Sequence, residues 1–136
     1  MCGISCRMPQ KVLLVDDDPL MHMLFQRHLE RAGYQMISAM DGQEGLEIAE
    51  RELPQVIVMD VMMPEIDGLE AIRRLRKNEA TKAIPVIVIT ANVTSYQASQ
   101  RESYVCGAAT FLTKPLSPAR LLQEVQRLMP PPVPAA

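Results

Sequence analysis

The sequence predicts an α/β fold in which a five-stranded parallel sheet is covered by helices on both faces. Short apolar segments rich in β-branched residues alternate strictly with longer amphipathic segments, which is typical of repeated strand–helix units. Several of the short segments are apolar almost without a break, as in strands that are buried on both faces. The five expected strands are residues 11–15, 35–39, 55–59, 85–89 and 109–112.

The amphipathic segments carry signals for helix ends. Four expected helices begin with a side chain that can cap backbone N–H groups, followed by a proline or by a glutamate at capping-box spacing. These pairs are Asp18 with Pro19, Asp41 with Glu44, Asp67 with Glu70, and Ser117 with Pro118. Gly33 and Gly107 stand where helices are expected to end.

Apolar residues at helical spacing predict the buried face of each helix. The predicted stripes are Met21, Leu24, Phe25, His28 and Ala32 in the first helix, Leu69, Ile72 and Leu75 in the third, and Leu121, Leu122, Val125 and Leu128 in the last. His28 is therefore expected at the edge of the core, whereas His22 lies off its stripe. A role for His22 as a phosphoryl donor is disfavoured, because such donors belong to helical bundles.

The composition narrows the functional class. The 136 residues suffice for one domain, and the 14 basic and 16 acidic residues are mixed along the chain, with a net charge of −2. No Lys/Arg cluster indicates direct nucleic-acid binding or a membrane surface. No apolar segment approaches the roughly 18 residues that span a bilayer, and no signal peptide is recognisable. We therefore expect a cytoplasmic protein.

The chain divides into three parts. We expect residues 1–10 to be a flexible extension, residues 11–129 the folded domain, and residues 130–136 a proline-rich linker or disordered tail. The three cysteines are odd in number, and the Cys-x₃-Cys pair lacks the second half of a metal site. Cys2, Cys6 and Cys106 are therefore interpreted as reduced thiols of minor structural importance.

Polar residues follow the expected strands where ligands bind in open parallel sheets, beyond the carboxyl ends. Asp16, Asp17 and Asp18 follow the first strand, and Asp60 follows the third. Asp18 is interpreted as a helix cap, which leaves Asp16 and Asp17 beside Asp60. Like charges packed together are costly unless a proton or a cation joins them, and carboxylate oxygens suit a hard ion such as Mg²⁺.

A hydroxyl and an ammonium are expected at the same edge. Thr90 ends the fourth strand, and Lys114 follows the fifth. In the doubly wound strand order 2-1-3-4-5, Lys114 starts about 10 Å from the third strand, a gap that its side chain can largely close. Each residue also has a simpler interpretation, as a strand-end hydroxyl or a solvated lysine.

Taken in order and at this spacing, four segments resemble the receiver domain of response regulators in two-component signalling (CheY-like). They are VLLVDDDP, MDVMMPEIDG, VIVITAN and FLTKP, and the resemblance covers residues 11–129. It implies a flavodoxin-like (βα)₅ fold with strand order 2-1-3-4-5. The implied site consists of the phosphoacceptor Asp60, a Mg²⁺ (or Mn²⁺) site at Asp16, Asp17, Asp60 and the backbone carbonyl of Met62, phosphoryl contacts from Thr90 and Lys114, and a switch formed by Thr90 and Phe111.

The resemblance also implies partners. A sensor histidine kinase or phosphotransfer protein would donate the phosphoryl group. The domain would catalyse only its own phosphorylation and dephosphorylation, so it is not expected to be an enzyme. The face formed by the fourth helix, fifth strand and fifth helix would act on a downstream effector or form a homodimer. The segment from Thr90 to Gly107 is about two residues longer than usual and polar, which suggests either a mobile output face or a simple insertion.

Three other functions remain as alternatives. A haloacid-dehalogenase-like phosphatase needs a second aspartate two residues after Asp60, where this chain has Met62. A flavodoxin-like cofactor site is disfavoured because the aspartates at positions 16–18 would repel a phosphate. A phosphorylation-independent domain on the same fold normally lacks one of the five site residues, and none is lost here.

Overall fold

The predicted parallel sheet is confirmed in the computed structural model, which describes residues 10–60, 68–90, 107–113 and 116–129. Its five strands are all parallel and lie in the order β2-β1-β3-β4-β5. The strands are β1 (Lys11–Val15), β2 (Gln35–Ala39), β3 (Val56–Asp60), β4 (Val86–Thr90) and β5 (Thr110–Thr113). The last three begin and end one residue later than predicted, so Asp60 and Thr90 are themselves the final residues of their strands.

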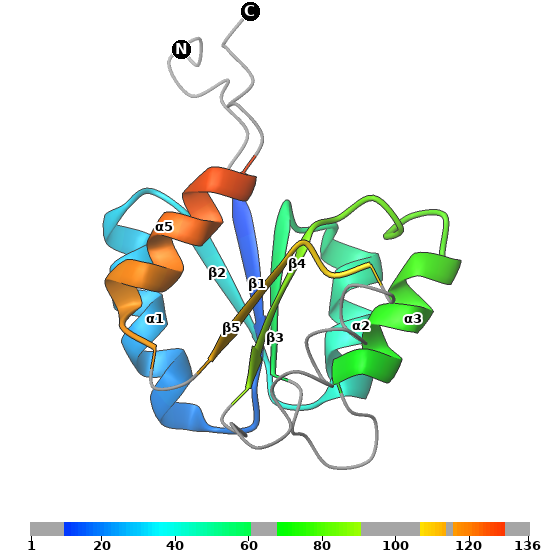
Figure 1. The fold of residues 1–136 in the computed structure, drawn as a ribbon, viewed down its shortest axis with the longest axis horizontal. Helices are drawn as coiled ribbons and strands as arrows, with labels where there is room; N and C mark the ends of the chain where they lie inside the picture. Colours follow the sequence, from blue (N-terminus) through cyan, green and yellow to red (C-terminus); the bar gives the residue numbers. More distant parts are fainter. Residues whose placement is uncertain (1–9, 61–67, 91–106, 114–115, 130–136) are drawn as a thin grey trace, which may run out of the picture.

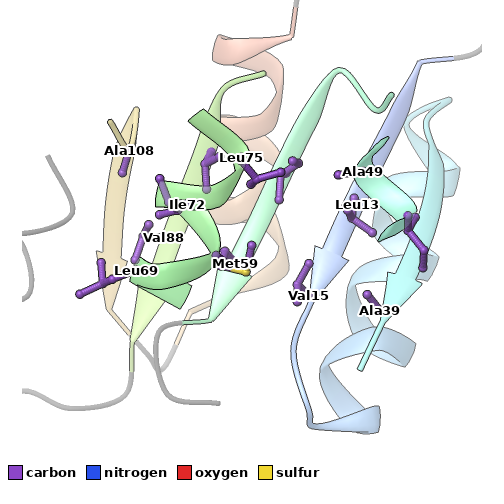
Figure 2. Packing of buried hydrophobic residues seen from close by; sticks show 14 of the residues in the cluster. Leu13, Val15, Ala39, Ala49, Met59, Leu69, Ile72, Leu75, Val88 and Ala108 are labelled. Carbon is purple, nitrogen blue, oxygen red and sulfur yellow. The ribbon is translucent and has the colours of Figure 1, made fainter. Parts of the chain in front are cut away.

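Helices cover both faces of the sheet (Figure 1). Helices α1 (Pro19–Arg31) and α5 (Pro118–Leu128) lie on one face, and α2 (Gly42–Glu52) and α3 (Gly68–Lys77) lie on the other. Two apolar clusters fill the layers between the sheet and the helices. Figure 2 shows the cluster beneath α2 and α3, in which Leu13 and Val15 of β1 point away from the α1 side. No helix in the described ranges is long and apolar enough to cross a membrane.

The predicted helix caps form where their residues are described. The Asp18 carboxylate accepts a hydrogen bond from the Leu20 N–H at 2.9 Å, and the Ser117 hydroxyl accepts one from the Arg120 N–H at 3.1 Å. Asp41 accepts from the Glu44 N–H at 2.8 Å, while the Glu44 carboxylate accepts from the Met40 N–H at 2.6 Å. Three of the four expected starts are thus confirmed, and the fourth, at Asp67, lies outside the described residues.

The predicted buried face of α1 is wrong by about one position. The residues that α1 buries are His22, Phe25 and Leu29, whereas Leu24 of the predicted stripe is 50% exposed. The helix also exposes Leu20 and Met23, so it has more apolar residues than one face can bury. Apolar spacing therefore did not decide the phase of the helix, and a hydrogen bond made by His22 favours the observed one.

Helix α2 packs unusually close to β1 at a glycine. A Cβ atom added to Gly45 would lie 2.8 Å from Cγ2 and 3.0 Å from Cγ1 of Val15. Both of these atoms belong to the fully buried side chain of the last residue of β1. The absence of a side chain at position 45 thus sets the distance between α2 and the strand that leads into Asp16.

We predict that Gly45→Ala destabilises the protein, although alanine is the better helix former. Overpacking typically costs about 1–3 kcal/mol, and the gain of about 1 kcal/mol in helix propensity offsets only part of it. Urea denaturation should show a net loss of about 1 kcal/mol, and at most about 2 kcal/mol, in the free energy of unfolding. Gln43→Ala, at an exposed position of the same helix, should leave stability nearly unchanged. A stabilised Gly45→Ala variant would contradict the close packing.

Candidate functional site

The register of the sheet brings the polar strand ends to one edge. Val15 pairs with Met59, and Asp60 pairs with Ile89, so the residues that follow β1 lie level with the end of β3 and one residue before the end of β4. Thr90 in turn pairs with Thr113, the last residue of β5. In Figure 1 this edge is the one opposite the start of β1 and the end of α5. The sheet therefore brings the polar residues at the ends of β1, β3, β4 and β5 to the same edge.

Three carboxylates meet at this edge, as the strand-end argument predicted. One carboxylate oxygen from each of Asp16, Asp17 and Asp60 lies within 4.8 Å of the other two. Asp16 is fully buried and Asp60 is 4% exposed, whereas Asp17 is exposed to solvent. Burial makes such an arrangement of like charges costly unless a cation or a proton compensates them. An all-oxygen donor set with one open side fits Mg²⁺, which uses few carboxylates and keeps several waters.

Asp16 is held at both its backbone and its side chain. Its N–H donates to the Ala39 carbonyl at 3.1 Å, which continues the β1–β2 ladder by one residue. Its Oδ1 accepts a hydrogen bond from the Asp18 N–H at 2.9 Å, and its carbonyl accepts one from Nε2 of His22 at 2.7 Å. The three adjacent aspartates therefore have different positions, as predicted. Asp18 caps α1, whereas the carboxylates of Asp16 and Asp17 lie near that of Asp60.

Thr90 and Phe111 lie on the same side of neighbouring strands. Val88 pairs with Phe111, and both belong to the cluster beneath α2 and α3. Because side chains alternate along a strand, Thr90 projects to the same side as Val88. Thr90 is 1% exposed and Phe111 is 6% exposed. The hydroxyl and the ring thus occupy one buried layer next to the acidic edge.

Several predicted residues lie outside the described part of the chain. They are Met62, Lys114, the segment of residues 91–106 with its expected helix, and the expected terminal extensions at residues 1–9 and 130–136. The roles expected for Met62 and Lys114 are therefore predictions that rest on the sequence alone.

A charged network joins α5 to β5 beside the predicted switch residue. Glu124 is only 8% exposed and accepts hydrogen bonds from Arg120 at 2.6 Å, from Arg127 at 2.8 Å and from the Thr110 hydroxyl at 3.2 Å. Arg127 also donates to the Thr110 hydroxyl at 2.6 Å. Hydrogen bonds from the two arginines lower the pKa of Glu124 to about 2, and the one from Arg120 has the larger effect. Sequence reasoning missed this network, since two of its charges are ordinary helix-surface arginines.

Helix α1 presents an apolar surface directly after the acidic edge. Leu20, Met23 and Leu24 are each at least half exposed. Together with Arg27 and His28 they line a shallow groove of about 430 Å³. The sequence signal for this surface is the excess of apolar residues on both sides of α1, because a helix that packs on one sheet can bury only one stripe.

The family model for the response regulator receiver domain matches residues 12–126 of this chain. The chain belongs to this family. Receiver domains are phospho-accepting modules of two-component signalling, and the family binds Mg²⁺ in an acidic pocket. The acidic edge of this receiver has the donor atoms that such a pocket requires.

Relatives and solved structures agree with this assignment. The chain is 37% identical over 122 residues to the alkaline phosphatase synthesis transcriptional regulatory protein PhoP of Bacillus subtilis. This match covers 90% of this chain and 49% of PhoP. The receiver thus spans about half the length of that relative. Chemotaxis protein CheY4 of Vibrio cholerae has a TM-score of 0.83 at 32% identity, covering 90% of this chain and all of CheY4.

One structural neighbour contains a metal ion. The receiver domain of the sensor histidine kinase PA1611 from Pseudomonas aeruginosa has a magnesium ion coordinated in its active-site cleft. It is 31% identical to this receiver with a TM-score of 0.79, and the match covers 89% of this chain and 98% of the neighbour.

We predict that Glu124 contributes to stability in a pH-dependent manner. Because its pKa is about 2 in the folded state and ordinarily 4.5, its contribution is complete above about pH 5 and is lost as the pH falls toward 2. Since both arginines are substantially exposed and solvent screens them, we expect a contribution of about 1 kcal/mol. Between pH 5 and pH 2.5, the free energy of unfolding should fall more steeply for the wild type than for Glu124→Gln. Parallel profiles would contradict the network.

Proposed function

We propose that this receiver accepts a phosphoryl group on Asp60 from a phosphohistidine of a sensor histidine kinase or phosphotransfer protein. The observation that carries the proposal is the position of Asp60, at the end of a fully buried strand and with a carboxylate oxygen within 4.8 Å of those of Asp16 and Asp17. Three carboxylates at one edge of the sheet supply the oxygen ligands that a hard divalent cation uses. Such a site suits the handling of a cation and a phosphoryl group.

Asp16, Asp17 and Asp60 would hold the Mg²⁺ (or Mn²⁺), together with the backbone carbonyl of Met62. When bound, the ion would neutralise negative charge on the phosphoryl oxygens. The fixed hydrogen bonds of Asp16 would keep one ligand in place before the ion binds. Asp17, which is exposed, would be the ligand that faces solvent.

In the proposed reaction, a carboxylate oxygen of Asp60 attacks phosphorus in line with the phosphohistidine nitrogen. The P–O bond to Asp60 forms as the P–N bond breaks, and the imidazole leaves with the bonding electron pair. The Thr90 hydroxyl would donate a hydrogen bond to the transferred group, and the Lys114 ammonium would neutralise part of its charge. Hydrolysis by water at phosphorus would return the free carboxylate and release inorganic phosphate.

The modification would act on the buried layer that contains Thr90 and Phe111. The phosphoryl group adds up to about −2 of charge, which would attract the Thr90 hydroxyl. Because Phe111 is packed on the same side of the adjacent strand, a shift of Thr90 would change the space available to the ring. A local charge change would thereby bias the face formed by the fourth helix, β5 and α5 toward an effector or a second copy.

The phosphoryl donor would dock on the exposed apolar surface of α1. Helix α1 begins immediately after the acidic edge, so a partner on Leu20, Met23 and Leu24 would lie beside the site. A large exposed apolar surface of this kind is typical of an interaction site.

We predict that acetyl phosphate with Mg²⁺ adds one phosphoryl mass to the wild type and none to Asp60→Asn. The substitution keeps the size of the side chain but removes the nucleophilic oxygen. Intact-mass spectrometry distinguishes the outcomes directly, and omission of Mg²⁺ provides the matched control. A mass gain that survives in Asp60→Asn would place the acceptor at another residue.

We also predict that the hydroxyl of Thr90 accelerates phosphorylation. Thr90→Val keeps the shape of the side chain but removes the donor, and a hydrogen bond to a charged group contributes about 1.5–3 kcal/mol. The initial rate of mass gain should therefore fall about tenfold or more in Thr90→Val. Thr90→Ser should remain within about threefold of the wild type, because it retains the donor. Equal rates for Val and Ser would exclude this role.

A further inference from the structure

His22 is a buried polar residue that the phosphoryl-transfer mechanism does not use. It is 7% exposed and lies on the face of α1 that packs against the sheet, in line with Phe25 and Leu29. Its Nε2 lies 2.7 Å from the carbonyl oxygen of Asp16, six residues earlier in the chain. Among the described residues, its Nδ1 is buried without a hydrogen-bond partner.

These contacts define the state of the ring. A carbonyl oxygen can only accept a hydrogen bond, so Nε2 must carry the hydrogen, and in the neutral ring Nδ1 then has a bare lone pair. A buried nitrogen without a partner loses the hydration that it has in the unfolded chain. An apolar side chain would avoid this loss at the same position. The contact with Asp16 is therefore the specific feature that a histidine adds here.

The carbonyl that accepts this hydrogen bond belongs to the peptide group that joins Asp16 to Asp17. Because a peptide group is planar, fixing its oxygen also fixes the direction of the Asp17 N–H and Cα. The preceding peptide group is fixed by the hydrogen bond from the Asp16 N–H to the Ala39 carbonyl at 3.1 Å. Between them, these two bonds fix the backbone of Asp16 and the position of the Asp17 Cα, from which the Asp17 carboxylate projects.

We propose that His22 is a positioning residue for the metal site, which orients Asp17 relative to Asp16 through the peptide group between them. This inference rests on the proposed function, because it assigns His22 a role only if the two carboxylates share a cation. It differs from a packing role in one respect: it requires a hydrogen-bond donor at the position of Nε2. Volume and apolar contact alone would not suffice.

Mg²⁺ binding to the whole chain tests the proposal without phosphorylation. The dissociation constant would be measured by isothermal titration calorimetry with MgCl₂ for the wild type, His22→Met and His22→Gln. Methionine fills the space without a donor, whereas the amide nitrogen of glutamine reaches the position of Nε2. We expect binding to weaken about tenfold in His22→Met, as is usual when a residue that orients metal ligands is lost. His22→Gln should remain within about threefold of the wild type.

Two controls separate positioning from stability. Phe25→Leu removes apolar contacts from the same face of α1 and should lower Tm without changing Mg²⁺ affinity. Asp16→Asn should abolish binding and thereby locate the titrated site. Affinity unchanged in His22→Met, or lost equally in His22→Met and His22→Gln, would overturn the role of His22 and leave the proposed function intact. Absence of Mg²⁺ binding in the wild type would overturn both.

The tautomer of His22 provides an independent test. Long-range ¹H–¹⁵N NMR spectra at pH 8 should show a hydrogen on Nε2 and none on Nδ1. This pattern would support donation to the Asp16 carbonyl. A ring with its hydrogen on Nδ1 could not donate from Nε2 and would overturn the proposal whatever the Mg²⁺ affinities.

Discussion

The convergence of three carboxylates at one edge of a buried parallel sheet is the constraint on which this receiver depends. Asp16 and Asp60 are almost fully buried, and their oxygens and that of Asp17 lie within 4.8 Å of one another. Such charges repel strongly in a medium that screens them poorly. Holding them together is costly unless a cation or a proton compensates their charge.

The elements around the acidic edge hold the carboxylates through the backbone. The ladder with β2 continues to the Asp16 N–H, and the Asp18 cap closes the turn into α1. Close packing of Gly45 on Val15 fixes the strand immediately before the turn. The ladder and the contact of Gly45 with Val15 are buried, whereas the Asp18 cap lies at the surface. The position of Asp16 is therefore set mainly by the buried contacts.

Sequence reasoning predicted the elements well because their signals are local. The caps at Asp18, Asp41 and Ser117 depend on residues within three positions of one another, and these caps form as expected. Two features that depend on tertiary packing were not predicted. The phase of α1 was missed because apolar residues occur on two of its sides, and the Glu124 network was missed because Thr110 lies on another element.

The sequence by itself determined the strand–helix alternation, the caps and the set of polar residues at the strand ends, because propensity, spacing and strand direction decide these features. Only the tertiary structure decided that His22 is buried and that Leu24 is exposed, since apolar residues on two sides of α1 leave its phase open until the helix packs on the sheet. It alone also decided the separation of the three carboxylates, because the register between β1, β3 and β4 is a property of the assembled sheet.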